Sequence, residues 1–312
     1  MRAIWLQNLE TKEYWNLLPS NPYKVLDEHG NGACPLLGIS GLGYSQNVTQ
    51  NQVGVDYFIS EITSKNTPIT GTLLFWHDKH IRLFQEFVGD FRKQLRLFYS
   101  PSGTFHIDDH TSNVFYKDVL LTQVGKTEMT QYSTYECAVT FTPQSDVWKS
   151  DHTYKIADVA NAGTALVYPY VYPYVYGGNE TLALNIDNKG RETGCVVRIK
   201  NTSANVENEI EWHCVHSYVD SYGETHEDVS KARFYLNLAP GAELLVNSNA
   251  LTQQAKVTFS DGTGQNVVAS QEPSWEYINF IQLEHGENRF IFFLPTTNLS
   301  IQVTYTEQRE II

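Results

Sequence analysis

Positive charge is scarce in this chain of 312 residues, which has 22 lysines and arginines against 35 aspartates and glutamates and a formal net charge of −13. A surface that binds nucleic acid or an anionic membrane needs basic residues to neutralise phosphates. We therefore expect no direct nucleic-acid binding and no membrane partner. Long apolar runs are missing too, and Asn8 and Glu10 interrupt the first one before it could act as a signal peptide. This pattern predicts that the protein folds in a cytoplasm.

Paired cysteines and catalytic motifs are also lacking. The four cysteines show no Cys-x-x-Cys spacing, which argues against a zinc knuckle or a disulfide framework; they are Cys34, Cys137, Cys195 and Cys214. The chain has no Gly-x-Ser-x-Gly nucleophile motif, no phosphate-binding P-loop and no His-Glu-x-x-His zinc motif. We therefore predict that the protein is not an enzyme and uses no cofactor or metal ion.

Two weaker patterns in the sequence could serve a metal site or a glycosidase. On a strand, His106, Asp108 and His110 would share one face and offer a metal ion two imidazoles and a carboxylate. The simpler interpretation is an exposed hairpin tip, because ligands rarely converge without support from the rest of the fold. A glycosidase needs two carboxylates across a cleft, but the local acidic pairs are typical of solvated strands and turns: Glu209 with Glu211, and Glu284 with Glu287.

Aromatic residues are plentiful, with 19 tyrosines against 2 methionines, and this composition favours β-structure. The densest run is VYPYVYPYVYGG at 167–178, whose two prolines restrict it to an edge strand or an extended connector. Alternation would place five tyrosines on one side: Tyr168, Tyr170, Tyr172, Tyr174 and Tyr176. Such a row can pack beneath another element, contact another subunit or bind sugars, and packing within or between chains is the preferred interpretation.

The first half of the chain predicts a β-domain with a single helix, ending near residue 150. Strand-like segments lie on both sides of HIRLFQEFVGDFRK, which has helical apolar spacing. Asp78 is the expected N-cap of a helix of about 15 residues. One apolar stripe marks this helix as a candidate assembly surface: Ile81, Phe84, Val88 and Phe91.

The second half, from residue 151 to 312, predicts an antiparallel β-sandwich or jelly roll. Short segments of alternating apolar residues recur about every ten residues, with turns and no helix between them. Ile210, Trp212 and Cys214 form one inward-facing set, and 217–230 is a polar segment that we expect to be exposed.

The order of four segments resembles the distal tail proteins of siphophages with Gram-positive hosts. These segments are ECAVTFTPQSDVW at 136–148, LNIDNKGRETGCVVRIKN at 184–201, LNLAPGAELLVNS at 236–248 and FIQLEHGENRFIFF at 280–293. The likeness covers nearly the whole chain. It implies that residues 1–150 form the N-terminal ring-forming domain, and that 151–312 form a galectin-like β-sandwich.

The resemblance also implies the biological role. Distal tail proteins form a homohexameric ring at the tail tip that joins the tail tube protein to the tail-associated hub protein and anchors receptor-binding protein. The expected location is therefore the virion baseplate, after assembly in the bacterial host cytoplasm. In some relatives an arm in the second domain holds the receptor-binding proteins, and 217–230 is the nearest candidate for such an arm here.

A carbohydrate-binding module is the alternative function. A galectin-like sandwich has a concave face, and exposed aromatic side chains on it could stack on the sugar rings of host cell-wall polysaccharide. The candidate residues for this role are Trp212 and Trp275, besides the tyrosine row. Sandwich folds serve many unrelated functions, so this alternative ranks second to the structural role.

Overall fold

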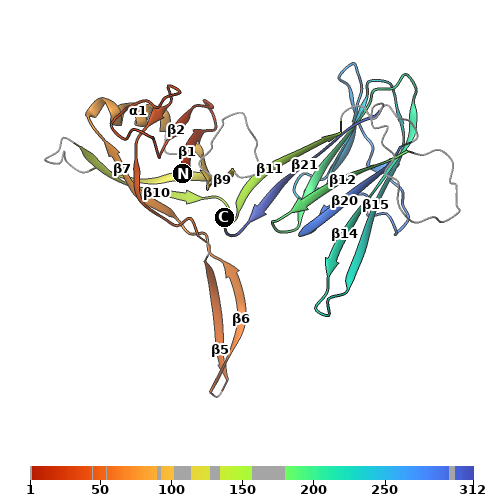
Figure 1. The fold of residues 1–312 in the computed structure, drawn as a ribbon, viewed down its shortest axis with the longest axis horizontal. Helices are drawn as coiled ribbons and strands as arrows, with labels where there is room; N and C mark the ends of the chain where they lie inside the picture. The colour runs from red at the N-terminus through yellow and green to blue at the C-terminus, as the bar shows by residue number, and fades with distance from the viewer. Residues whose placement is uncertain are drawn as a thin grey trace. The chain divides into compact units, whose positions relative to one another are not determined.

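The computed structural model describes residues 2–43, 45–53, 55–89, 93–101, 114–126, 134–156, 180–294 and 299–312. The chain divides into two compact units. Unit 1 comprises 1–150 together with 308–312, and unit 2 comprises 151–307. Both units are built mainly of strands, as predicted (Figure 1).

The main strands of unit 1 form a curved sheet. Its strands follow the order β3-β2-β1-β8-β9-β10-β7-β4, and all neighbours are antiparallel except β2 and β3. The bounds are β1 Ala3–Asn8, β2 Tyr14–Asn16, β3 Gly32–Ala33, β4 Leu36–Ser40, β7 Ile69–Phe75, β8 Gln94–Ser100, β9 Phe115–Lys126 and β10 Tyr135–Pro143. A further strand, β11 (Trp148–Ile156), pairs with β9 at Lys149 and Tyr116 and leads the chain into unit 2.

The single α-helix of the described residues, α1 (Asp78–Val88), is shorter than predicted. Its N-cap is His77 and not Asp78, because the His77 Nδ1 accepts a hydrogen bond from the backbone N of His80 at 3.1 Å. The helix stops at Gly89, whose φ of +63° lies in the left-handed region that favours glycine. The helix therefore ends at this glycine, although the helical spacing of apolar residues in the sequence continues to Phe91. Phe91 itself lies outside the described residues.

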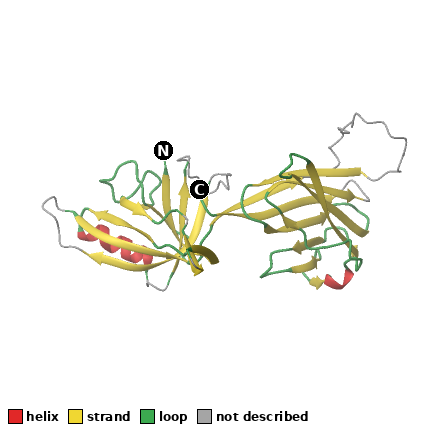
Figure 2. Cartoon of the chain, turned by 90° about the horizontal axis from the view of Figure 1, so that it is seen from below, coloured by secondary structure: helices red, strands yellow, loops and turns green. Residues whose placement is uncertain are grey.

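The sheet of unit 1 wraps around α1 (Figure 2). Trp15 on β2 and Phe75 on β7 belong to opposite halves of the sheet, yet both contact Phe84 of the helix, with ring centroids 5.2 and 5.4 Å apart. Trp148 is fully buried in the same core and donates its indole N–H to the Leu42 carbonyl oxygen at 3.0 Å. The helix therefore fills the inside of the curve.

His80 is a buried titratable residue in this core. Its ring lies edge-on against Phe75 and stacked on Trp15, and its Nε2 donates to the Ala33 carbonyl oxygen at 2.7 Å. Burial lowers the pKa of His80, the Ala33 hydrogen bond opposes this, and nearby His77 adds to the lowering. The residue is therefore neutral in the folded protein at neutral pH.

Unit 2 is a sandwich of two antiparallel sheets, as predicted. One sheet follows the order β18-β17-β16-β13-β21 and the other β12-β20-β14-β15. The bounds are β12 Glu180–Asn188, β13 Thr193–Asn201, β14 Glu207–Val219, β15 Thr225–Leu238, β16 Glu243–Asn247, β17 Gln254–Thr258, β18 Gly264–Asn266, β19 Gln282–Leu283, β20 Gly286–Leu294 and β21 Leu299–Arg309. β19 is a short strand that pairs with β13. A one-turn 3-10 helix, η2 (Val268–Ser270), follows β18.

Buried asparagines fix the turns of unit 2. Asn188, the last residue of β12, donates its amide to the Arg191 and Leu283 carbonyl oxygens at 2.9 and 3.2 Å. Asn201 donates to the Leu238 carbonyl oxygen at 2.8 Å. Both side chains are completely buried. These turns lie in the segments that carry the resemblance to distal tail proteins, and they have a structural reason there, because each amide satisfies carbonyl groups that would otherwise be buried without partners.

Candidate interaction surfaces

A separate hairpin extends away from the body of unit 1 (Figure 1). β5 (Gln46–Val53) and β6 (Asp56–Ser64) pair with each other along their whole length and form a two-stranded sheet of their own. A two-stranded hairpin is only marginally stable alone in water. Its exposed position makes it a candidate for contact with another chain by strand addition or face packing.

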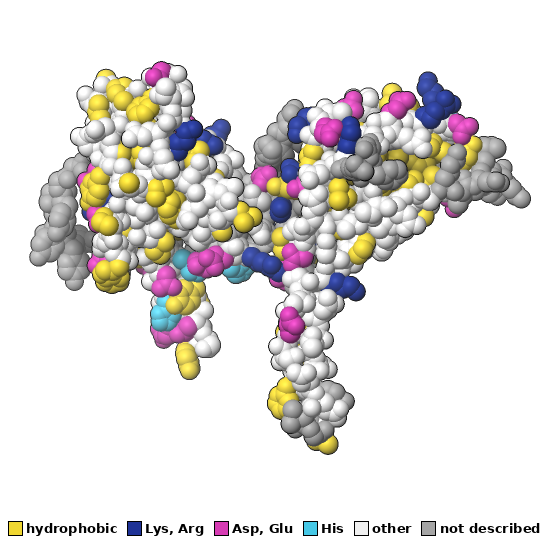
Figure 3. All heavy atoms as spheres, turned by 180° about the vertical axis from the view of Figure 1, so that it is seen from behind, with side chains coloured by type: hydrophobic (Ala, Val, Ile, Leu, Met, Phe, Trp, Pro, Cys, Tyr) yellow, Lys and Arg dark blue, Asp and Glu magenta, His cyan; other side chains and the backbone are white. Residues whose placement is uncertain are grey.

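The side chains of this hairpin support that interpretation. Within 46–64 only Asp56 and Glu61 are charged. Five apolar side chains are 46–88% exposed: Val48, Val55, Phe58, Ile59 and Ile62. In the space-filling view the hairpin is mostly uncharged, with hydrophobic atoms near its end (Figure 3). An apolar surface of this kind on a polar ribbon is typical of a protein contact.

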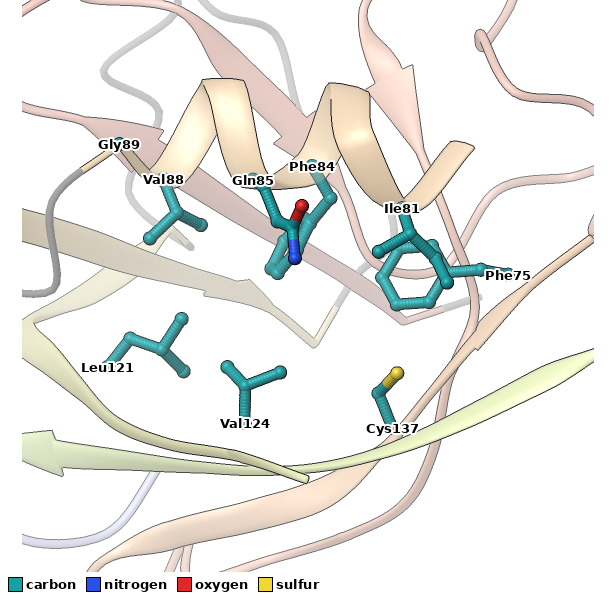
Figure 4. A pocket seen from close by; sticks show the side chains of 9 residues that line it. All are labelled: Phe75, Ile81, Phe84, Gln85, Val88, Gly89, Leu121, Val124 and Cys137. Carbon is teal, nitrogen blue, oxygen red and sulfur yellow. The ribbon is translucent and has the colours of Figure 1, made fainter. Parts of the chain in front are cut away.

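The predicted assembly stripe of α1 lies inside unit 1. Ile81, Phe84 and Val88 are at most 7% exposed and point toward β7, β9 and β10. They line an apolar cavity of about 260 Å³ together with Phe75, Gln85, Gly89, Leu121, Val124 and Cys137 (Figure 4). Contact within the unit therefore accounts for this stripe, and its role between subunits remains only a prediction.

The outer face of the β12-β20-β14-β15 sheet carries a second candidate surface. Alternation sends Trp212 of β14 and Phe234 of β15 into the core, where their rings stack with centroids 5.7 Å apart. The intervening residues face outward. Glu211 lies directly opposite Arg233, and Glu209 lies opposite Tyr235.

Arg233 organises this outer face. Its Nε donates to the Glu211 carboxylate at 2.8 Å, and a second bond runs from Nη2 to the same carboxylate. Glu211 also contacts the His213 Nε2 at 2.7 Å. The Arg233 guanidinium lies 4.9 Å from the centroid of the Tyr277 ring. Burial, and then the Glu211 charge, raise the pKa of the Tyr277 phenol. The Glu211 carboxylate is therefore occupied by its neighbours, which does not suit a catalytic acid.

A loop at 271–279 lies along the free side of β15. The backbone N of Glu272 donates to the Arg233 carbonyl oxygen at 2.9 Å, and that of Asn279 donates to the Lys231 carbonyl oxygen at 3.0 Å. Trp275 lies in a turn of this loop and is 90% exposed. The two predicted sugar-stacking residues thus differ, because Trp212 is 1% exposed and has no ring face open to a ligand.

The β14–β15 hairpin also projects beyond its sheet. β20 pairs with β14 only from Glu211 to His216, whereas β15 pairs with β14 as far as Val219. This end gathers histidine, acidic and hydrophobic side chains (Figure 3). Tyr222 at the turn is 90% exposed. The polar segment predicted at 217–230 is therefore mostly a two-stranded ribbon.

Several predicted site residues lie outside the described residues, namely the five tyrosines of 167–178 and His106, Asp108 and His110. In the parts of the chain that are described, no group of three or more His, Cys, Asp or Glu residues could hold a metal ion. No helix of those parts is both long and apolar enough to cross a membrane. The four cysteines are all buried free thiols.

Sequence reasoning missed two features, the projection of the β5–β6 hairpin and the Arg233 network. The β-favouring side chains of Phe58, Ile59 and Ile62, following an uncharged segment at 46–53, were a signal for the hairpin. No local signal exists for Arg233, since its partners Glu211 and Tyr277 lie 22 and 44 residues away along the chain.

Comparisons with known proteins agree with the predicted resemblance. Residues 25–144 match the family model of the N-terminal domain of distal tail proteins. The crystal structure of the Dit protein of phage SPP1, described as a paradigm of the hub adsorption apparatus in phages that infect Gram-positive bacteria, is 10% identical with a TM-score of 0.52, over 88% of this chain and 92% of that chain. A chain of the phage P2 baseplate in its activated conformation with Ca is 13% identical with a TM-score of 0.51, over 100% of both chains.

At these identities the solved structures show the fold. No curated protein matches the chain significantly. The match to the family model rests on sequence and covers most of unit 1. Together, the two findings confirm the resemblance to phage distal tail proteins.

Proposed function

We propose that the chain is a structural protein of the phage tail baseplate and forms a homohexameric ring at the tail tip. The match of residues 25–144 to the N-terminal domain of distal tail proteins and the fold shared with the two phage structures support this role. One face of the ring would receive the tail tube protein and the other the tail-associated hub protein. The proposed host is a Gram-positive bacterium, in whose cytoplasm the virion is assembled. This role requires no catalysis.

The main structural support for the proposed ring is the β5–β6 hairpin. Its exposed apolar side chains and its separation from the main sheet suit contact with an identical neighbour. In a ring, the hairpin of each subunit would meet a different surface of the next subunit, which is the head-to-tail contact from which closed rings are built. Like-charge repulsion between acidic subunits and DNA phosphates favours a lumen through which DNA slides without binding.

Mass photometry and negative-stain electron microscopy of the purified protein test this proposal. We expect rings with six-fold symmetry, alone or after mixing with tail tube protein. Solitary monomers at micromolar concentration, both with and without the tube protein, would contradict it.

Anchoring of receptor-binding protein is the second part of the proposal, and the β14–β15 ribbon supports it. The ribbon extends beyond β20 and ends in exposed side chains, among them Val219 and Tyr222, 65% and 90% exposed. A short ribbon with an exposed aromatic tip can seat in a partner's groove.

Virions carrying Tyr222→Ser and Val219→Ser test this anchoring role. We expect complete tails that lack receptor-binding protein by quantitative mass spectrometry. A matched control is Leu251→Ser, an exposed site on another loop of unit 2. Normal receptor-binding protein in the double variant would refute the assignment of the ribbon.

A further inference from the structure

We propose that unit 2 binds an uncharged saccharide on its outer face, with Trp275 as the stacking platform. The ligand class is a pyranose unit of a neutral polysaccharide. This binding site is independent of ring formation, because all residues that form it belong to unit 2. It would give the baseplate a weak contact with a cell surface in addition to its structural role.

The indole of Trp275 is both exposed and held in place. The Tyr277 backbone N donates to the Ser274 carbonyl oxygen at 3.0 Å and closes a tight turn around Trp275. The loop on either side of this turn is fastened to β15 by the backbone bonds of Glu272 and Asn279. An aromatic platform on a fastened loop loses little conformational entropy when a ligand binds. Because the Trp275 side chain is large and 90% exposed, covering it with a ligand would bury apolar surface and contribute favourable binding free energy.

Hydrogen-bonding side chains flank Trp275 in the chain. The Glu272 carboxylate accepts from the Tyr235 hydroxyl at 2.7 Å and from the Ser274 backbone N at 3.1 Å, so it is oriented toward the turn that carries Trp275. On the other side of Trp275 in the chain, Glu276 lies 3.7 Å from the Lys231 Nζ. Carboxylates and ammonium groups form strong, charge-assisted bonds with hydroxyl groups. A pyranose offers both parts that this surface needs, namely a C–H face for the indole and hydroxyls at its edge.

The charges around Trp275 favour an uncharged ligand over a phosphate-bearing polymer. Arg233 is already held by Glu211, which leaves Lys231 as the cation beside the loop. Four carboxylates belong to the same surface, and they would repel a polyanion: Glu209, Glu211, Glu272 and Glu276. A protein partner is disfavoured as well, because a stable protein interface buries about 800 Å² on each side, with an apolar centre. Here the exposed large apolar side chains of the loop are those of Trp275 and Ile278, and charged groups flank them.

Calorimetric titration and saturation-transfer NMR with uncharged tetrasaccharides test the proposal on the full chain. The probes are tetrasaccharides of glucose, galactose and N-acetylglucosamine, and polyglycerol phosphate serves as the anionic comparison. We expect one of the neutral probes to bind with a dissociation constant of about 1 mM, and its ring C–H protons to receive the strongest transfer. Polyglycerol phosphate should not bind.

Variants separate the platform from general effects on the fold. We expect Trp275→Ala to weaken binding about tenfold and Trp275→Tyr to retain most of it, because a phenol ring also stacks. Leu251→Ala changes a side chain of unit 2 that is 99% exposed and should leave binding unchanged. The proposal is overturned if no neutral probe binds at about 10 mM, if Trp275→Ala binds as well as the wild type, or if polyglycerol phosphate binds more tightly. None of these outcomes depends on whether the sample is monomeric or hexameric.

Discussion

Removing the apolar face of the β5–β6 hairpin should dissociate the proposed ring without unfolding the subunit. The pairing of β5 with β6 shifts register between Thr49 and Gln50, so that Val48 lies opposite Ile62 and Gln50 lies opposite Ile59. Val48 and Gln50 share a face of β5, and Ile59 and Ile62 therefore share that face of the hairpin. The perturbation is the double variant Ile59→Ser and Ile62→Ser. Since both side chains already face water in the isolated chain, we expect its thermal unfolding to match that of the wild type.

The size of the effect follows from the exposed fractions. Complete burial of an Ile side chain contributes about 1.5–3 kcal/mol. Ile59 is 58% and Ile62 54% exposed, so about half of that contribution remains to be gained on assembly, and the pair should supply ~2–3 kcal/mol per interface. The dissociation constant of each interface should therefore rise ~30–150-fold in the double variant.

Mass photometry over a dilution series measures this shift as the concentration at which half of the rings have dissociated. Val229→Ser is the matched control, because Val229 is an exposed apolar residue on a strand of unit 2 with 48% exposure, and it should not move the midpoint. If wild-type rings and double-variant rings dissociate at the same concentration, the hairpin is not the contact between subunits.

Three further predictions concern stability. Replacing Phe234 by Ala removes the ring stacked on Trp212 and should destabilise unit 2 by about 3–5 kcal/mol, as measured by denaturant unfolding. Replacing Gly89 by Ala forces a β-carbon onto a φ of +63° and should destabilise unit 1 by about 1 kcal/mol, whereas no loss of stability would mean that the helix end is not strained. The pKa of His80 is lower in the folded protein than in the unfolded chain, so the unfolded chain binds more protons below about pH 6.5. The wild type should therefore lose stability as the pH falls from 7 to 5. His80→Gln should show a smaller loss over the same range, and an equal loss would refute this origin.

Sequence patterns predicted those parts of the fold whose causes are local. The apolar stripe of Ile81, Phe84 and Val88 predicted α1, and alternation predicted that Trp212 and Cys214 face inward. The end of the helix was missed because the spacing continues past Gly89, while the backbone conformation at that glycine decides where the helix stops.

The candidate sites were less predictable, because they depend on contacts between distant segments. Trp275 is exposed and Trp212 is buried. This difference depends on the strand or loop that each tryptophan occupies, and the neighbouring residues in the sequence do not reveal it. The pairing of Glu211 with Arg233 requires the register of β14 against β15. Register is set by the whole sandwich, so a single sequence offers no rule for it.

The chain enters unit 2 along β11 and leaves it along β21, and its last residues rejoin unit 1, where Ile312 packs against the core. Residues 151–307 are thus inserted into unit 1 and are connected to it at both ends. A replacement for this segment must therefore fit both connections. Stopping the polypeptide after residue 150 would remove unit 2 and would also remove residues 308–312 from unit 1. A graft that exchanges residues 151–307 while keeping 308–312 would instead attach a different module to an intact unit 1.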